Sequence, residues 1–278
     1  MRVANREDRD RWVMCLNDAA QLTIKDLYDY DERNVIGQGR YAVVCPARRR
    51  VNSGTTNTNL ECALKIIDKN EFWRRVVRGV ERADTIVRET SVQATLTAKC
   101  GRLSTFLQIR GIFETVDHFV IEMELLESTD LFRHVKSKNV IEEEEAAQIM
   151  RDIFISLDSM ARIGIAHRDI KPANVLMCDR EKCGVTVKVA DFGMSGFAGV
   201  DGHLRGRCGT PGYVAPEIWT AAVHGGYGNK VDIYSAGVTL YVLLCGYEPF
   251  IGESDAELIA ANRAAIVDYP DEDWSRSK

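Results

Sequence analysis

The sequence lacks any apolar run that approaches the ~20 residues a helix needs to cross a bilayer. It also lacks an apolar leader, because its first residues, MRVANREDRDRW, are mostly charged and do not form a secretory signal. Its net charge of −5 provides no basic field of the kind that nucleic-acid binders use. We therefore expect no nucleic-acid partner and no membrane contact from this chain.

Cysteine pairs with metal-ligand spacing are also missing. The eight cysteines are scattered, and the closest two, Cys178 and Cys183, do not form a C-x-x-C pair. This spacing disfavours a zinc site, and cysteines at this density in a chain without a secretory signal indicate reduced thiols. We expect a cytoplasmic protein, with the nucleus as the alternative.

What the sequence does contain is enough apolar residues, 45% of 278, for a large core in one domain or two lobes. Strand-like alternation dominates the first part, at 33–51, 60–67, 105–113 and 118–125, with one helical pattern at 83–99. Helical spacing dominates the second part, at 129–137, 142–162, 229–246 and 254–265, with short strands near 174–177 and 185–190. These patterns predict an α+β protein whose two lobes meet near 124–128.

A glycine-rich turn and a strand lysine suggest phosphate chemistry. Gly37 and Gly39 lie in a strand–turn–strand pattern, where the missing side chains let backbone N–H groups approach a phosphate. A simple hairpin is the alternative for this motif. Lys65 lies in an apolar strand, and the alternative there is an edge lysine with its ammonium group in water. Glu89, in the helical pattern that follows, is the candidate carboxylate to hold that ammonium group.

The most informative segment is AHRDIKPAN at 166–174, which is followed by DFG at 191–193. Asn174 and Asp191, presented from two loops, can share Mg²⁺ ions with the phosphates of a substrate. Asp169 can accept a hydroxyl proton, and Lys171 can offset charge on a transferring phosphoryl group. Each residue alone could be an ordinary loop residue, but their joint order points to phosphoryl transfer.

With these motifs the chain resembles eukaryotic protein kinases over roughly residues 30–274. The matching pieces are the glycine-rich loop, Lys65, Glu89, the H-R-D-x-x-x-x-N loop at 167–174, D-F-G at 191–193 and A-P-E at 215–217. The resemblance implies the bilobal protein-kinase fold over 30–278. Its β-rich N-lobe would span about 30–124 and its α-helical C-lobe about 127–278. It also implies ATP and Mg²⁺ as cofactors and protein substrates with Ser/Thr acceptors.

The resemblance also implies a role for each matching residue. Lys65 would hold the α- and β-phosphates and pair with Glu89, and Asp169 would orient the attacking hydroxyl with Lys171 beside it. Asn174 and Asp191 would bind the metal, and Asp232 would brace the catalytic loop. The implied nucleotide site consists of Ile36, Gly37, Gly39, Val44, Ala63, Lys65, the gatekeeper Met123, Glu124, Leu126, the ribose-binding Asp130, Asn174, Leu176 and Asp191.

Shorter sequence segments narrow the group of protein kinases that the chain resembles. Lys171 after Asp169, and GTPGY at 209–213, resemble Ser/Thr kinases, and the segments 66–69, 208–217 and 246–250 resemble the calcium/calmodulin-dependent group. The helical pattern within residues 1–20 resembles the closing helix of a pleckstrin-homology domain, an arrangement found in protein kinase D. An ordinary amphipathic leader helix is the alternative. In basophilic relatives the acid at the position of Asp130 recognises an arginine three before the acceptor, so the resemblance implies a preference for Arg at minus three. Those relatives have further acids for an arginine at minus two where this chain has Ala173 and Val242, which implies little selection at minus two.

Two positions depart from the kinase pattern in the active region. Gln93 occupies a place where relatives have an apolar residue under the D-F-G phenylalanine. We expect a buried amide without partners there, at a cost of roughly 1–3 kcal/mol, and a loose stack. In relatives, the arginine at the position of Arg168 contacts a phosphorylated residue in the loop between D-F-G and A-P-E. In this sequence the stretch 194–209 of that loop contains one hydroxyl residue, Ser195. We therefore hypothesise that activation needs no phosphate on this loop.

The resemblance further implies that C-terminal helices are missing, including the arginine that pairs with Glu217. We therefore expect an uncompensated buried carboxylate at Glu217. Calmodulin could bind only through a missing tail. The alternatives to an active Ser/Thr kinase are an inactive truncated fragment and a pseudokinase scaffold, although the retained Lys65, Glu89 and Asp169 argue against lost chemistry.

Overall fold

The structure is a computed structural model that describes residues 21–50, 61–100, 105–126 and 129–275. The expected helix within residues 1–20 lies outside these described residues. The chain divides into two compact units. Unit 1 contains the described residues up to 83 together with 109–125, and unit 2 contains 84–108 and those from 126 onward.

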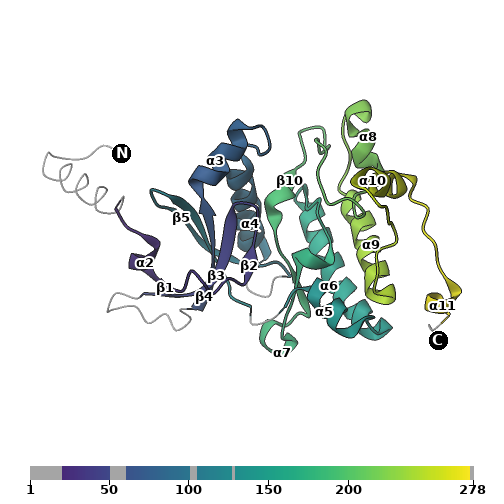
Figure 1. Ribbon diagram of the computed structural model, residues 1–278, viewed down its shortest axis with the longest axis horizontal. Helices are drawn as coiled ribbons and strands as arrows, with labels where there is room; N and C mark the ends of the chain where they lie inside the picture. The colour runs from purple at the N-terminus through teal and green to yellow at the C-terminus, as the bar shows by residue number, and fades with distance from the viewer. Residues whose placement is uncertain (1–20, 51–60, 101–104, 127–128, 276–278) are drawn as a thin grey trace, which may run out of the picture. The chain divides into compact units, whose positions relative to one another are not determined.

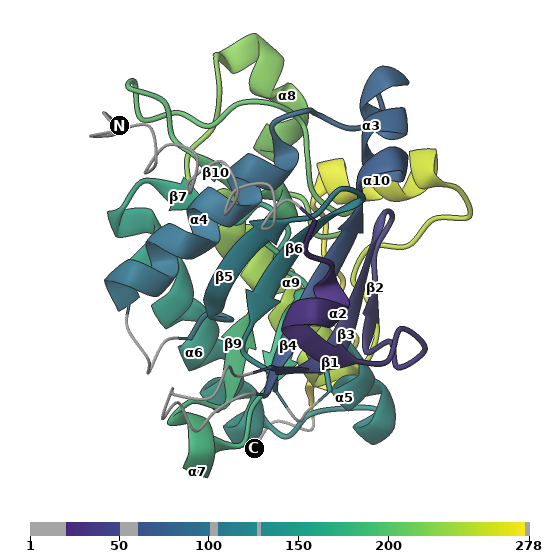
Figure 2. The same cartoon turned by 90° about the vertical axis from the view of Figure 1, so that its left-hand side faces the viewer.

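Unit 1 is built on an antiparallel sheet of six strands in the order β1-β3-β4-β6-β5, with β2 paired to β3 (Figure 2). Its elements are α2 (Ile24–Leu27), β1 (Tyr28–Tyr30), β2 (Gly37–Gln38), β3 (Ala42–Arg49), β4 (Glu61–Asp68), α3 (Lys69–Val77), β5 (Ile109–Glu114) and β6 (His118–Met123).

The centre of this sheet follows from the apolar strand β4. Five of its eight positions are apolar, namely those at 62–67 other than Lys65, and Leu64 and Ile67 are fully buried. A short run of this kind suits a strand that is covered on both faces. Tyr28 packs with Leu64 and Val120 in one apolar cluster.

Helix α3 lies between the predicted strand at 60–67 and the predicted helix at 83–99, where the sequence pattern indicated no regular element. Asp68 caps its N-terminus by accepting a hydrogen bond from the N–H of Glu71 at 2.7 Å. Phe72 is buried and lies edge-on to the rings of Tyr41 and Phe119. One buried aromatic residue therefore anchors a helix whose other residues are largely polar.

Unit 2 is mainly helical (Figure 1). Its elements are α4 (Thr85–Cys100), α5 (Leu131–Lys138), α6 (Glu143–Arg162), β7 (Ile165–Ala166), η1 (Pro172–Asn174), β8 (Val175–Met177), α7 (Arg180–Cys183), β9 (Val187–Val189), η2 (Phe192–Met194), β10 (Gly196–Phe197), α8 (Pro216–His224), α9 (Val231–Cys245), α10 (Asp255–Ala264) and α11 (Asp271–Trp274). A β-rich first part and a helical second part confirm the α+β expectation.

The core of unit 2 lies between α6 and α9, which pack against each other. Ile149 and Ile153 of α6 and Leu243 of α9 are fully buried in it. The same cluster contains Val92 of α4 and Phe192 of the D-F-G motif. The core therefore reaches directly beneath the loops that carry the predicted chemistry. None of the helices in the described part is both long and apolar enough to cross a membrane.

Candidate active site

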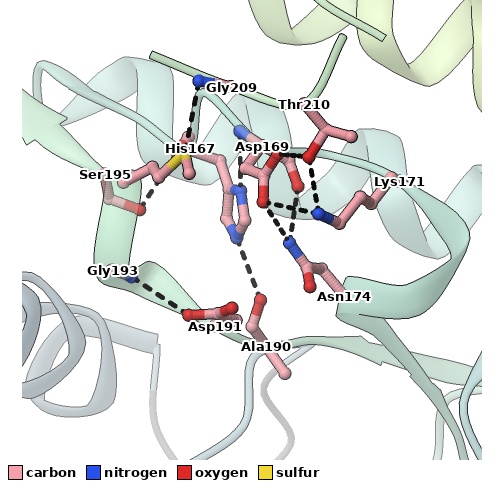
Figure 3. A network of polar contacts seen from close by, with 11 residues as sticks. His167, Asp169, Lys171, Asn174, Ala190, Asp191, Gly193, Ser195, Gly209 and Thr210 are labelled. Carbon is pink, nitrogen blue, oxygen red and sulfur yellow. Dashed lines mark hydrogen bonds and ion pairs between the residues drawn. The ribbon is translucent and has the colours of Figure 1, made fainter. Parts of the chain in front are cut away.

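Asp169 lies at the centre of a hydrogen-bonded loop between β7 and β8 (Figure 3). Its side chain is almost entirely buried. The amide of Asn174 donates to both the backbone carbonyl and the Oδ2 atom of Asp169, each at 2.8 Å. The Nζ atom of Lys171 lies 3.1 Å from the same Oδ2 atom. Asn174 and Lys171, which the sequence predicted for the same site, therefore both contact Asp169.

Thr210 closes this group from the segment after D-F-G. Its hydroxyl donates to Asp169 Oδ1 at 2.6 Å and accepts from Lys171 Nζ at 2.6 Å (Figure 3). The sequence argument used Thr210 only as part of a Ser/Thr-type signature and missed this contact. Its position in the GTPGY segment was the available signal.

Asp232 of α9 supports the catalytic loop from within the core. Its two carboxylate oxygens accept hydrogen bonds from the backbone N–H groups of His167 and Arg168, both at 2.7 Å. Burial raises the pKa of Asp232, and the two N–H donors oppose that shift because they stabilise the charged form. These bonds are the bracing contact that the resemblance implied for Asp232.

The D-F-G segment turns sharply at its first residue. Asp191 has a left-handed backbone with φ of 60°, and one of its carboxylate oxygens accepts from the N–H of Gly193 at 3.3 Å. Phe192 is buried, with ring centroids 6.1 Å from Phe106 and 5.3 Å from His167. A non-glycine residue with this φ is held there by its surroundings, as functional turns often are.

Helix α4 contributes Glu89 and a second charged residue to the same region of unit 2. Glu89 is buried, and one of its carboxylate oxygens lies 3.6 Å from the point that a Cβ atom on Gly193 would occupy. Arg88 donates to the carbonyl of Gly193 at 3.4 Å. The sequence argument identified Glu89 but missed Arg88, which was visible only as one of several arginines. Glu89 thus lies next to D-F-G, and its pairing with Lys65 stays a prediction.

Gln93 of α4 differs from the expectation of an unpaired amide. It is buried, but its Nε2 atom donates to the carbonyl of Leu107 at 3.0 Å. That expectation was wrong because the partner belongs to a segment 14 residues away, which no local pattern connects to Gln93. The cost of an unsatisfied amide beneath Phe192 therefore does not arise.

Glu217 also differs from its expectation. It lies in the first turn of α8, directly after Pro216, and it is exposed. An exposed carboxylate keeps its hydration, so the penalty of a buried unpaired charge was wrongly expected here.

Unit 1 presents its predicted nucleotide-binding residues on neighbouring strands. In the register of the sheet, Val44 pairs with both Gly37 and Lys65. Ala63 pairs with Met123 of β6. Further bonds close the glycine-rich hairpin, from the N–H of Ile36 to Val44 O at 2.9 Å and from the N–H of Gly39 to Ala42 O at 2.7 Å. These glycines therefore lie in a hairpin, and the phosphate-binding role predicted for it stays a prediction.

Apart from Glu124, the remaining members of the predicted nucleotide site lie in unit 2. Asp130 and Leu176 form an antiparallel bridge, which places them side by side. Asp130 also caps α5, because its Oδ1 atom accepts from the N–H of Arg133 at 2.8 Å. Glu124 precedes Leu125, the last residue of unit 1, and Leu126 opens the second part of unit 2; Glu124 and Leu126 are both half-buried.

The oxygen atoms of Asn174 and Asp191 fit a magnesium ion. The amide nitrogen of Asn174 faces Asp169, which leaves its oxygen directed away from that carboxylate (Figure 3). Within the described residues no group of three or more His, Cys, Asp or Glu side chains could hold a metal. A carboxylate and an amide oxygen suit Mg²⁺, which takes few protein ligands and completes its shell with phosphates and water.

Comparison with known proteins agrees with this geometry. The family model described as the protein kinase domain matches residues 30–277. The chain belongs to the protein kinase family, whose members use ATP, generally with Mg²⁺, and act on protein substrates.

Similar proteins narrow the class of protein kinase to the Ser/Thr kinases. The chain is 32% identical to a probable myosin light chain kinase of Dictyostelium discoideum over 96% of its own length and 70% of the relative. It is 28% identical to myosin light chain kinase A of the same organism, over 90% and 77% respectively. It is 32% identical to a calcium/calmodulin-dependent protein kinase type 1 of Caenorhabditis elegans, over 87% and 63%. The chain is a protein serine/threonine kinase similar to the calcium/calmodulin-dependent group.

Proposed function

We propose that this chain transfers the γ-phosphate of ATP to Ser/Thr hydroxyls, with Asp169 as the group that accepts the hydroxyl proton. The observation that carries the proposal is the arrangement around Asp169, whose carboxylate is fixed by Thr210, Lys171 and Asn174. A carboxylate held by several donors is already oriented when a hydroxyl arrives, which lowers the entropy cost of reaction. Lys171, beside it, is the cation for charge on the transferred group.

We further propose roles for the residues that bind the nucleotide. Lys65 holds the phosphates and Glu89 holds Lys65, while Asn174 and Asp191 provide oxygen ligands to Mg²⁺. When bound, the metal neutralises charge on the phosphate oxygens. The support is chemical, since unit 1 contributes one lysine in an apolar strand, and unit 2 contributes a buried Glu89 next to D-F-G.

The decisive experiment is a peptide phosphorylation assay on the wild-type chain and on Asp169→Asn. We expect the rate to fall by about three orders of magnitude or more while the melting temperature changes little. Asp152→Asn is the matched control, because Asp152 also accepts backbone N–H bonds, from Thr186 and Val187, but lies outside the site. A wild-type chain that melts cooperatively without turnover would indicate the scaffold alternative, and one without a cooperative melt would indicate the inactive fragment.

We also propose that the substrate preference is Arg at minus three with little selection at minus two. Asp130, whose side chain is 20% exposed, supplies a carboxylate for such an arginine, although Arg133 Nε already lies 3.4 Å from it. The two positions that would read minus two lack acids, since Ala173 is exposed without charge and Val242 is buried.

A positional peptide library tests this preference. We expect Asp130→Asn to reduce selection for Arg at minus three, by about fivefold for the loss of one exposed ion pair of ~1 kcal/mol. Strong selection at minus two in the wild-type chain would contradict the proposal.

We also propose a cytoplasmic location for this chain. Six described cysteines are free thiols, three of them buried, which supports a reducing compartment such as the cytoplasm, with the nucleus as the alternative. Imaging of the tagged protein tests this. Calmodulin dependence, named for the Caenorhabditis elegans relative, is proposed here only through a segment outside residues 1–278.

A further inference from the structure

The guanidinium group of Arg168 is held by neutral oxygens of the segment after D-F-G. Its Nε atom donates to the carbonyl of Met194 at 2.7 Å, and Nη2 donates to the carbonyl of Ser195 at 3.2 Å. Its Nη1 atom donates to the carbonyl of Arg205 at 3.0 Å and to the hydroxyl of Tyr227 at 3.2 Å. Arg168 thus links Met194, Ser195 and Arg205 of the segment 194–209 to the catalytic loop, and every group that accepts its hydrogen bonds is uncharged.

Tyr227 is the side chain that completes this arrangement. It is buried, and its hydroxyl donates to the carbonyl of Gly206 at 2.8 Å while it accepts from Arg168. Its backbone pairs with Leu204 in both directions, at 2.8 and 3.0 Å. Burial raises the pKa of Tyr227 to about 12, so the hydroxyl keeps its proton at neutral pH and remains a donor.

Two glycines allow the close approach. A Cβ atom on Gly226, which has φ of 140°, would lie 2.7 Å from the carbonyl oxygen of Leu204. A Cβ atom on Gly196 would lie 2.8 Å from Arg168 Nη2. Because the atom that faces Gly226 belongs to the backbone, the contact there depends on glycine, whereas at Gly196 a Cβ atom would displace the end of the Arg168 side chain.

The segment 194–209 has no accessible hydroxyl residue whose phosphate could bind Arg168 instead of these neutral oxygens. Ser195, the only hydroxyl residue in 194–209, is fully buried and donates to the carbonyl of His167 at 3.3 Å. At the end of this segment the N–H of Gly209 contacts the sulfur of Met194 at 3.2 Å, and the next residue, Thr210, binds Asp169 (Figure 3). Tyr227 thus contacts Arg168, Arg168 contacts Met194, and Met194 contacts Gly209. Gly209 directly precedes Thr210, the residue that orients the carboxylate of Asp169.

We propose that Tyr227 is a positioning residue that holds the segment 194–209 against Arg168, so that Thr210 reaches Asp169 without a phosphate on the segment. The inference rests on the proposed phosphotransfer function and assigns its activation to a neutral hydrogen-bond network. Tyr227 acts through Arg168 and touches neither substrate nor nucleotide.

The test compares Tyr227→Phe with Tyr241→Phe in unphosphorylated protein, produced with a phosphatase and checked by intact mass. Tyr241 is a matched control because it is also buried and donates to a carbonyl, that of Asp268 at 3.1 Å, without contacting Arg168 or the segment. We expect kcat to fall about tenfold or more for Tyr227→Phe, with KM for ATP within about twofold. For Tyr241→Phe, kcat should stay at the wild-type value.

Trypsin provides a readout that does not depend on turnover. The bond after Arg205 contains the carbonyl that Arg168 holds, and Arg207 follows within the same segment. We expect cleavage at these two sites to be about tenfold faster in Tyr227→Phe than in Tyr241→Phe, because the hydrogen bonds that close the segment are lost.

The results for the Tyr227→Phe and Tyr241→Phe variants distinguish failure of the positioning role from failure of the proposed phosphotransfer function. Equal kcat and equal cleavage in the two variants would overturn the positioning role, as would a wild-type chain that needs a phosphate on 194–209 for activity. If the wild-type chain shows no transfer at all, the proposed function fails, while faster cleavage of Tyr227→Phe would still support the closed segment.

Discussion

Thr210 donates a hydrogen bond of 2.6 Å to the carboxylate of Asp169, although 41 residues separate them in the sequence. The same hydroxyl accepts from Lys171, so one side chain orients the predicted proton acceptor and the cation beside it. Because Thr210 belongs to the segment after D-F-G, the position of that segment and the geometry of the catalytic loop depend on each other.

Removing the Thr210 hydroxyl should therefore slow the chemical step. We expect Thr210→Val, which keeps the shape, to lower kcat by about 10- to 100-fold, equivalent to ~1.4–2.8 kcal/mol. Thr210→Ser keeps the hydroxyl and should remain within about threefold of the wild-type kcat. Steady-state kinetics with a peptide substrate measure both, and equal losses in the two variants would refute the role of the hydroxyl.

Asp232 should be a larger determinant of stability than other carboxylates that bind backbone N–H groups. In Asp232→Asn one amide nitrogen must face a buried N–H donor, which we expect to cost about 2–4 kcal/mol of unfolding free energy. Asp152→Asn makes the same change at a half-buried site that binds Thr186 and Val187, and should cost about 1 kcal/mol. Denaturant unfolding measures both, and a smaller loss at Asp232 would contradict the bracing role.

The hydrogen bond of Gln93 predicts an effect opposite to that of an unpaired amide. Gln93→Glu removes the donor to the Leu107 carbonyl and buries an acid, so it should destabilise the protein by about 2–3 kcal/mol. If Gln93 were unpaired, Gln93→Met would stabilise the protein, whereas we expect a loss of about 1 kcal/mol from the stranded carbonyl. Chemical denaturation of the two variants distinguishes these cases.

Tyr28 predicts a loss of stability at alkaline pH. Burial and its 2.6 Å hydrogen bond to Glu122 raise the pKa of Tyr28 above that of an unfolded tyrosine, ~10. Its stabilising contribution is therefore complete below pH ~10 and is lost as the pH rises further, because the unfolded state releases the proton first.

The matched test is Tyr28→Phe against Tyr30→Phe, two residues further along β1 and only half-buried. At pH 7 we expect Tyr28→Phe to cost about 1–3 kcal/mol, since buried Glu122 loses a donor, and Tyr30→Phe to cost less. Tyr28→Phe should also show a smaller fall in stability between pH 9 and pH ~11 than the wild-type chain. Identical alkaline profiles would exclude Tyr28 as the titrating group.

Much of the fold followed from local patterns. The apolar spacing of 142–162 predicted α6 within about a residue at each end, and that of 229–246 predicted α9 within about two. The short helix α8 and the helix α3 were missed, because few residues in each carry the periodic signal. In α3 a single buried residue, Phe72, provides the anchor.

By itself the sequence determined the chemistry, because the order of Asp169, Lys171, Asn174 and Asp191 places those functional groups on two loops whatever the packing around them. It did not determine what holds those groups in place. Thr210 on Asp169, Asp232 on His167 and Arg168, Leu107 on Gln93 and Tyr227 on Gly206 are contacts between residues 14 to 65 positions apart. Periodicity and local propensity carry no information about such partners, since only the packing of α4, α9 and the loop segments brings them within hydrogen-bonding distance. The reactive groups are thus readable from the chain, and their orientation is a property of the tertiary structure.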